Sequence, residues 1–184
     1  MQDKLNSTFA PRGGVIARPG FGEQGVAPHF VYTLTCRDKA GNVKWVEEFK
    51  NLVTTAGKNH LLDTYFEGAA YTAAFFLGLI DASGYTAVDA ADTMASHAGW
   101  TEATQYDEAT REALSFAAAA AGSKATDVVA AFTINATKTI KGAFVCTNNT
   151  KGGTTGTLYS AGAFAADRSL VAADVLEVTV TMTA

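Results

Sequence analysis

The sequence predicts an all-β protein: a β-sandwich or jelly-roll-like body with one capping helix and an extended N-terminal arm. Three observations support this fold class. Apolar and polar residues alternate along the C-terminal half, most regularly over residues 176–183, and a period of two places successive side chains on opposite faces of a strand. Residues 54–66 are the one convincing helical pattern, so the strand–helix alternation of parallel sheets is missing. All three prolines lie in residues 1–29.

Residues 1–29 are the predicted arm, and residues 30–184 are the predicted body. Prolines and five glycines prevent a regular period in the arm, because proline removes a backbone donor and glycine raises the cost of ordering. A purely solvating tail would contain few apolar residues, whereas this segment has several. It is therefore either a loose terminus or an extended arm that binds a partner. The candidate binding residues are Phe9, Arg12, Val15, Ile16, Arg18 and Phe21.

Residues 30–37 and 43–49 alternate on either side of the glycine-containing turn 38–42. This spacing predicts a β-hairpin. We expect these inward-facing residues: Phe30, Tyr32, Leu34 and Cys36 from the first strand, and Val43, Trp45 and Phe49 from the second.

The helix predicted over residues 54–66 begins at Thr54 or Thr55, either of which can accept a backbone N–H as N-cap. Apolar residues recur at helical spacing opposite a polar face, and Gly68 follows as a stop signal. These apolar residues are Leu61, Leu62, Tyr65 and Phe66. We expect this stripe to cover an open end of a sheet.

The middle of the chain is less regular. Residues 73–80 are apolar on both faces, which predicts a central strand covered on both sides. Residues 81–99 form a long connection, with a helical turn as one option over 89–96. Residues 100–106 are a candidate short strand. Residues 111–120 are expected to form a strand, with a helix as the alternative because alanine favours helices.

Three further strands are predicted in residues 128–135, 139–146 and 176–183, with short strand segments at 157–160 and 168–171. Each of the three should bury one face and leave the other in water, as antiparallel sheets do. The expected inward residues are Val128, Phe132 and Ile134; Ile140, Phe144 and Cys146; and Leu176, Val178, Val180 and Met182. A total of about eight to ten strands is typical of a sandwich or jelly roll.

The composition limits the class of protein. The 184 residues, 48 % of them hydrophobic, suffice for one domain with a core, while the 17 % charged content lies below the usual level of about a quarter. Low charge suits either a surface covered by partners or a small alanine-rich β domain. The net charge of −4 argues against nucleic-acid binding, which needs a basic stripe. No signal-peptide pattern follows Met1, and the longest apolar run is too short to cross a bilayer.

We predict no catalytic, cofactor or metal site, and therefore no enzyme. The three histidines lack zinc-site spacing, and the aspartates of residues 81–99 lack the calcium-loop pattern. Residues 158–162 resemble a nucleophile elbow without its first glycine, and residues 151–156 resemble a phosphate loop in composition only. Three carboxylates could form a glycosidase pair but are expected to face solvent. They are Glu102, Asp107 and Glu108.

Two cysteines and two tyrosines complete the candidates. Cys36 and Cys146 lie on the apolar sides of their strands and are expected to be buried free thiols. A disulfide stays open as the alternative, because it depends on a separation that the sequence does not show. Tyr85 and Tyr106 fall in predicted loops and are the candidates for a surface contact, such as a sugar-binding surface.

Four segments carry a resemblance to a known group of proteins. They are residues 51–57 (NLVTTAG), 94–100 (MASHAGW), 150–160 (TKGGTTGTLYS) and 174–181 (DVLEVTVT). Together they resemble small structural proteins of tailed bacteriophages, whose nearest described class is the head decoration or cement proteins. The resemblance spans roughly residues 51–184 and implies a β-rich body on the virion, without catalysis or a cofactor.

The resemblance also implies a location and partners. The protein would be made in the host cytoplasm and would bind the capsid exterior, where it stabilises the lattice. Its partners would be the major capsid protein and neighbouring copies of itself, as a homo-oligomer, with no nucleic acid and no membrane. The alternative is a tail or fibre module that binds a host receptor or a glycan.

Overall fold

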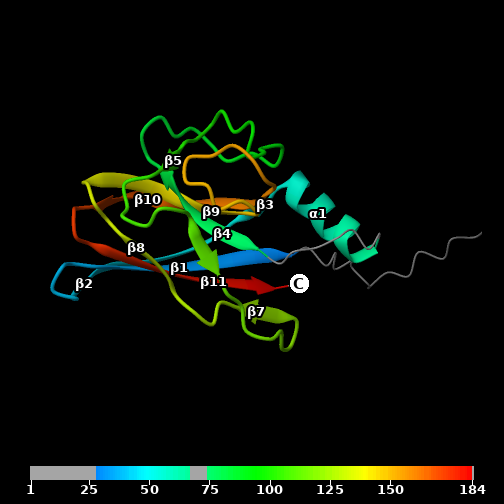
Figure 1. The fold of residues 1–184 in the computed structure, drawn as a ribbon, viewed down its shortest axis with the longest axis horizontal. Helices are drawn as coiled ribbons and strands as arrows, with labels where there is room; N and C mark the ends of the chain where they lie inside the picture. The colour runs from blue at the N-terminus through cyan, green and yellow to red at the C-terminus, as the bar shows by residue number, and fades with distance from the viewer. Residues whose placement is uncertain (1–27, 67–73, 184) are drawn as a thin grey trace, which may run out of the picture.

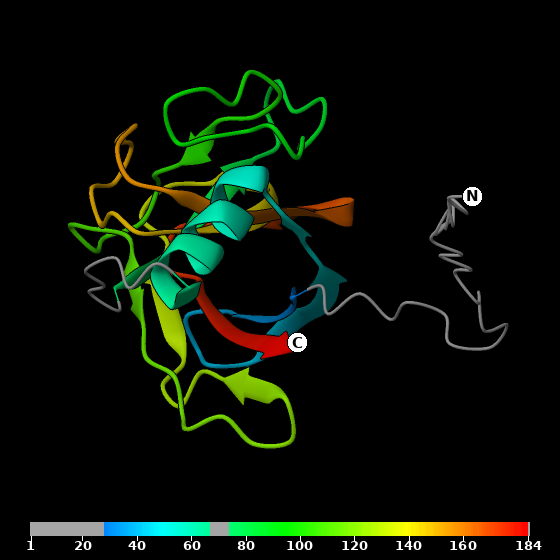
Figure 2. The same cartoon turned by 90° about the vertical axis from the view of Figure 1, so that its right-hand side faces the viewer.

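The computed structural model describes residues 28–66 and 74–183. Within these residues, two sheets pack face to face and one helix lies at an end of the sandwich (Figure 1; Figure 2). The elements are β1 (His29–Arg37), β2 (Val43–Lys50), β3 (Leu52–Val53), α1 (Thr55–Phe66), β4 (Phe75–Asp81), β5 (Glu102–Ala103), β6 (Glu112–Leu114), β7 (Ser123–Ala125), β8 (Ala130–Thr133), β9 (Lys138–Cys146), β10 (Leu158–Leu170) and β11 (Val175–Thr183).

The predicted arm, apart from its last two residues, lies outside the described residues. The same holds for its six candidate binding residues, which are Phe9, Arg12, Val15, Ile16, Arg18 and Phe21, and for the predicted helix stop at Gly68.

All pairs between the named strands are antiparallel. The five-stranded sheet has the order β2-β1-β11, and both β7 and β8 pair with the far edge of β11. The six-stranded sheet has the order β3-β10-β9-β4, and both β5 and β6 pair with β4. The predicted all-β sandwich with a single helix is therefore confirmed for the described residues.

β1 and β11 lie at the centre of the five-stranded sheet, and both alternate as predicted. The inward residues of β1, Phe30, Tyr32, Leu34 and Cys36, are at most 1 % exposed. On β11, Leu176, Val178 and Val180 are 0 % exposed and Met182 packs against the core. The residues between them are half-buried on the outer face. Burying a large apolar side chain contributes roughly 1.5–3 kcal/mol, so these two strands supply much of the stability of the sandwich.

The predicted hairpin joins β1 to β2 through the turn 38–42. Phe49 is buried, and Trp45 is half-buried against the core, as predicted. Val43, however, is 52 % exposed, contrary to the prediction. The cause is a bulge, because Val43 and Trp45 pair with adjacent residues of β1 and Lys44 has no paired residue on that strand. Such an extra residue reverses the alternation of the strand.

The three predicted inward residues of β9 do not share one face. Ile140 belongs to the core between the sheets, whereas Phe144 and Cys146 belong to a second core on the outer side of the six-stranded sheet. The pairing of β9 with β4 is shifted by a bulge that omits Lys141. The bulge moves the following residues to the opposite face, which a simple period of two cannot predict.

The loop after β4 covers the outer face of the six-stranded sheet. Trp100 lies on Phe144, with ring centroids 5.0 Å apart, and its Nε1 donates to a carboxylate oxygen of Asp92. β4 is consequently buried on both faces, as predicted for a central strand. The helical turn considered over residues 89–96 does not form, and two of its residues pair in an isolated β-bridge instead.

The other strands differ from their predictions mainly in length. β5 and β6 are shorter than the predicted strands 100–106 and 111–120, and the helical alternative for the second does not form. The short segments predicted at 157–160 and 168–171 belong to one strand of 13 residues, β10, whose pairing with β9 is irregular in its middle. Val128 is 62 % exposed, contrary to the prediction, because β8 begins after it.

Candidate functional site

The N-terminus of α1 is anchored to β10 through Thr54, one of the two predicted N-caps. The Thr54 hydroxyl accepts the N–H of Gly57 at 3.0 Å, which is the N-cap bond. It also donates to the carbonyl of Leu158, while the Thr54 N–H donates to the carbonyl of Tyr159 at 3.1 Å. Because Thr54 is fully buried, these bonds fix the start of the helix on the six-stranded sheet.

Gly57 fixes the rotation of α1 about its own axis. It is the one buried residue of this helix, and a Cβ atom there would lie 2.3 Å from the carbonyl oxygen of Tyr159. Only glycine allows such a close approach of helix and strand. Residues three and four apart share a helix face, so the face of Gly57 continues through His60, Leu61 and Thr64. This face lies against the sandwich.

Most of the apolar stripe of α1 is exposed, so the prediction that it covers a sheet end is wrong. Leu62 and Phe66 point away from the sandwich, while Leu61 and Tyr65 line a groove beside it. The exposed fractions are 40 % for Leu61, 51 % for Leu62, 79 % for Tyr65 and 75 % for Phe66. The Tyr65 and Phe66 rings contact each other, with centroids 5.0 Å apart. In the described part of the chain, no other large apolar side chain is as exposed as these two. A contiguous exposed apolar patch is typical of a protein-contact surface.

An apolar groove of about 350 Å³ lies between α1 and the end of the sandwich, where Figure 2 shows the helix crossing the view. The helix contributes His60, Leu61, Thr64 and Tyr65 to its walls, and the six-stranded sheet contributes Phe75 and Tyr159. The rings of Phe75 and Tyr159 contact each other edge to face, with centroids 5.3 Å apart. The groove and the exposed stripe together form one surface, which we call the α1 surface.

β1 begins beside the α1 surface. Its first residue is His29, and the N–H of Phe30 donates to the side-chain oxygen of Asn51 at 2.9 Å. The ring centroid of Phe30 lies 5.5 Å from that of Tyr159, which lines the groove. The chain that precedes β1 therefore joins the body at the same end as α1.

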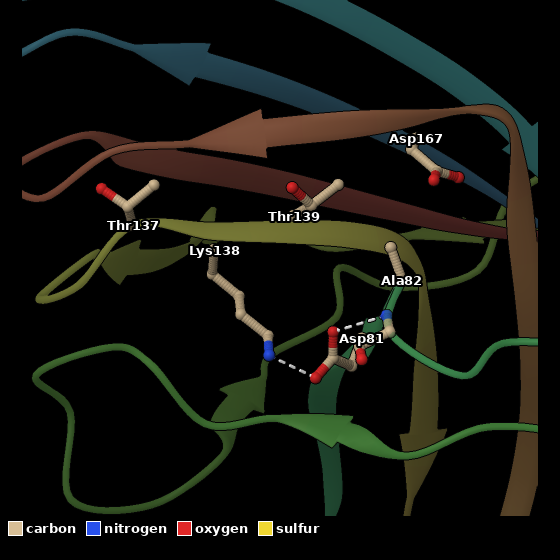
Figure 3. A pocket seen from close by; sticks show the side chains of 7 residues that line it. Asp81, Ala82, Thr137, Lys138, Thr139 and Asp167 are labelled. Atoms are coloured by element: carbon tan, nitrogen blue, oxygen red, sulfur yellow. Dashed lines mark hydrogen bonds and ion pairs between the residues drawn. The ribbon is translucent and has the colours of Figure 1, made fainter.

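A second, polar groove of about 450 Å³ lies where β4 ends and the pairing of β9 with β10 is irregular (Figure 3). Asp81 and Lys138 form an ion pair in this groove. At its border Lys141 binds Asp167, with 3.0 Å between Nζ and Oδ1. Ala82 and several serine and threonine residues line the rest. Charged groups and hydroxyls of this kind can bind a polyhydroxylated ligand through hydrogen bonds.

Tyr85, one of the two predicted surface contacts, lies near the polar groove. The Nζ atom of Lys141, which also binds Asp167, lies 5.7 Å from the centre of the Tyr85 ring. Tyr85 is half-buried because part of its ring packs against the second core. The rest of the side chain stays at the surface.

Tyr106, the other predicted surface contact, is only 1 % exposed, so that prediction is wrong. Its ring packs on Phe132 with centroids 4.9 Å apart, and the Nζ atom of Lys151 lies 4.3 Å from the ring centre. Burial raises the pKa of the Tyr106 hydroxyl well above its ordinary value. An isolated β-bridge to Ile134 holds this loop residue against the core.

Arg111 is a structural residue that the sequence analysis missed. Its buried side chain forms a bidentate ion pair with Glu102, at 3.0 Å and 2.7 Å, and donates to the carbonyls of Asn148 and Gly153. Burial lowers the pKa of Arg111, but the Glu102 carboxylate raises it, and the net shift is upward. Arg111 therefore stays charged and holds the loop 148–156. Glu102 is held against Arg111 in the interior, so the prediction that it faces solvent is wrong.

The other predicted carboxylates and the phosphate-loop lysine face solvent or bond to backbone groups. Asp107 is exposed, as predicted, whereas both carboxylate oxygens of Glu108 accept the N–H of Thr133. Lys151 donates to the backbone carbonyls of Tyr106 and Glu108. Its ammonium group therefore holds a loop in place.

The side chains of Ser160, Cys36 and Cys146 are buried. Ser160, from the elbow-like segment, lies in the middle of β10 with its hydroxyl 2.8 Å from that of Tyr32. Cys36 and Cys146 are both buried and free, as expected, so the disulfide alternative is excluded. Burial raises the pKa of both thiols, to about 12 for Cys36. A thiol in this state is a weak nucleophile.

The chain matches no protein-family model and no curated protein sequence. Among the residues that the structure describes, no group of three or more His, Cys, Asp or Glu side chains is placed to hold a metal ion. The same residues include no helix with the length and apolar character of a membrane span. The α1 surface and the polar groove are candidate binding surfaces of the described residues.

Proposed function

We propose that this protein is a structural component of a tailed-bacteriophage virion that binds the outer capsid surface and stabilises the capsid lattice. It acts on the capsid exterior after synthesis in the host cytoplasm. Its partners are the major capsid protein and neighbouring copies of the chain, with which it forms a homo-oligomer. The resemblance of residues 51–57, 94–100, 150–160 and 174–181 to phage structural proteins supports the assignment to a virion.

The observation that carries the contact role is the exposed α1 surface beside the start of β1. Tyr65 and Phe66 are 79 % and 75 % exposed, although a rotation of the helix would turn them toward the sandwich. The segment that precedes β1, with its apolar residues, joins the body at this same end. One end of the molecule thus presents two apolar elements, which suits attachment to a lattice of protein subunits.

The copy number of the protein on purified particles tests the lattice role. A decoration protein is present in hundreds of copies that follow the capsid symmetry, because each lattice position offers the same contact. We expect quantitative mass spectrometry and a particle reconstruction to find this. A handful of copies at one vertex would contradict the proposal and would favour a tail component.

Removal of residues 1–28 tests the role of the arm on the capsid. Each apolar side chain that the arm buries would contribute roughly 1.5–3 kcal/mol before ordering costs, and many copies on one lattice add avidity. We expect the truncation to leave the melting temperature nearly unchanged and to weaken binding to undecorated particles at least about tenfold, or 1.4 kcal/mol. Full occupancy by the truncated protein would show that the arm is not a binding element.

The polar groove favours a second candidate function, a tail or fibre module that binds a host glycan. Asp81 and Lys138 offer an acceptor and a donor, and Tyr85 lies nearby. In this case Asp81→Asn should weaken glycan binding, whereas Asp107→Asn, at an exposed site elsewhere, should not. Binding of the wild-type protein to host surface polysaccharide, measured by calorimetry, decides whether this function exists.

The proposal includes no enzymatic role. Ser160 lies buried with its hydroxyl bonded to Tyr32, and the carboxylates Glu102 and Glu108 bind protein groups. Purified protein should give only background turnover of esterase, glycosidase and peptidase substrates. Turnover that disappears in Ser160→Ala would contradict this part of the proposal.

A further inference from the structure

Two apolar features meet the body at the end where β1 begins. The first is the α1 surface, where Leu62, Tyr65 and Phe66 face solvent because Gly57 sets the rotation of the helix. The second is the arm, which joins the body beside the groove and contains Phe9, Val15, Ile16 and Phe21. The arm offers apolar side chains, and the α1 surface offers an apolar groove and stripe that could bury them.

We infer that the α1 surface is the docking site for the arm of a neighbouring copy of this chain. The arm would lie extended across the helix, and its apolar side chains would contact Leu62, Tyr65 and Phe66 and enter the groove. The binding is therefore a contact between copies, in which each molecule offers an arm and a helix.

The size of the α1 surface favours an extended segment over a globular partner. A stable interface between folded proteins buries about 800 Å² on each partner. The exposed stripe comprises four side chains of a 12-residue helix, which is too small for such an interface. An extended peptide, in contrast, binds by placing a few alternate side chains into pockets, and the groove of about 350 Å³ is large enough for such a side chain.

The length of the arm allows it to reach a neighbouring copy. Residues 9–21 precede Pro28 by enough chain to extend roughly 25–60 Å. The body has a diameter of roughly 40 Å, so this reach extends to an adjacent molecule.

The charges are compatible with this contact. The arm has a net charge of +1, and the rest of the chain has −5. A basic arm is attracted to the acidic body of a neighbour, although salt weakens the effect. A single arm on a single helix is a reversible contact whose population rises with protein concentration, and many copies on a lattice strengthen it.

The inference supplies a copy-to-copy contact for the proposed lattice role, but its test uses no particles. Failure of the capsid role and failure of this contact are therefore separate results.

The test uses two full-length variants that each disable one half of the contact. The arm variant carries Phe9→Ser, Ile16→Ser and Phe21→Ser, and the helix variant carries Tyr65→Ser and Phe66→Ser. Sedimentation equilibrium over a range of concentrations measures self-association. We expect wild type to self-associate reversibly, and each variant alone to do so at least about tenfold more weakly, a change of 1.4 kcal/mol.

Mixing the two variants identifies the contact. The intact arm of the helix variant can dock on the intact helix of the arm variant, so an equimolar mixture should form heterodimers, seen by fluorescence anisotropy of one labelled partner. An arm variant that self-associates like wild type would show helix-to-helix packing and would overturn the inference. Two inactive variants that do not complement each other would show that the arm does not bind the helix of another copy, which would also overturn it.

A matched control distinguishes specific binding at the α1 surface from nonspecific hydrophobic association. Val128→Ser with Val129→Ser changes two exposed apolar residues, 62 % and 48 % exposed, at a different site. The control should associate like wild type, and all variants should keep the wild-type melting temperature because the changed residues described here lie at the surface. Equal loss of association in the control, or no self-association of wild type, would overturn the inference.

Discussion

β11 and α1 both have an apolar stripe that follows the period of the element, yet one stripe is buried and the other is exposed. Leu176 and Val178 on β11 are 0 % exposed, while Leu62 and Tyr65 on α1 are 51 % and 79 % exposed. β11 has β1 on one side, β7 and β8 on the other, and the second sheet across its apolar face. α1 meets the sandwich through Gly57, on its smallest face.

Which residues share a face and whether that face is buried are two separate properties, although one sequence pattern suggests both. A period of 2 or 3.6 identifies which residues share a face. Burial of that face depends on a neighbouring element, and α1 is held in a different rotation by one glycine and one N-cap. An apolar face that the fold leaves exposed does little for the stability of the body, so its residues are free to serve binding.

The largest effect is expected for a charge placed in the buried stripe of β11. Val180→Asp puts an unpaired carboxylate among fully buried side chains, which should cost at least about 4 kcal/mol or abolish folding. Thr179→Asp adds the same charge to the half-buried outer face and should cost much less. Urea unfolding followed by tryptophan fluorescence measures both. Equal midpoints would mean that the faces of β11 are assigned incorrectly.

Arg111→Met should show that a polar network can be as important as the apolar core. Loss of the guanidinium group leaves the buried Glu102 carboxylate unpaired, and breaking such a pair costs about 3–5 kcal/mol. The loop 148–156 should also lose protection from amide hydrogen exchange. The double variant with Glu102→Gln should recover part of the stability, because no charge is then left buried. A double variant less stable than Arg111→Met alone would contradict this account.

Gly57→Ala tests the contact that turns the stripe of α1 outward. Alanine normally stabilises a helix interior relative to glycine, but here its Cβ atom would lie 2.3 Å from the carbonyl oxygen of Tyr159. Overpacking of this kind costs about 1–3 kcal/mol. Asn59→Ala, on the exposed side of the same helix, should be neutral or stabilising. If hydrogen exchange of α1 slows equally in both variants, the close contact does not hold the helix.

The smallest effect is expected at the exposed stripe, where a matched pair of substitutions makes the comparison direct. Leu62→Ala should change the free energy of unfolding by no more than about 0.5 kcal/mol. The same change at Leu176, which is 0 % exposed, should cost about 2–5 kcal/mol. Thermal and urea unfolding measure both. A cost at Leu62 close to that at Leu176 would mean that the body itself buries the α1 stripe.

Much of the fold follows from local patterns. The hairpin of β1 and β2, the alternation of β11, the two-sided burial of β4 and the start of α1 near Thr54 all appear in the sequence, because each depends on residues close together in the chain. The bulges at Lys44 and Lys141 do not, and each one reversed a predicted face. A bulge depends on the strand paired across the sheet, which a local pattern does not contain.

The candidate surfaces depended more on long-range contacts than the fold did. The spacing of the apolar residues of α1 indicates a stripe, but the carbonyl of Tyr159, about a hundred positions away, sets the direction in which the stripe points. Tyr106 and Arg111 are buried by contacts with β8 and with the loop 148–156. Amino-acid types and their spacing establish which faces exist. Side-chain and backbone contacts between distant segments establish which of those faces stay open to a partner, because burial depends on the three-dimensional neighbours of a residue.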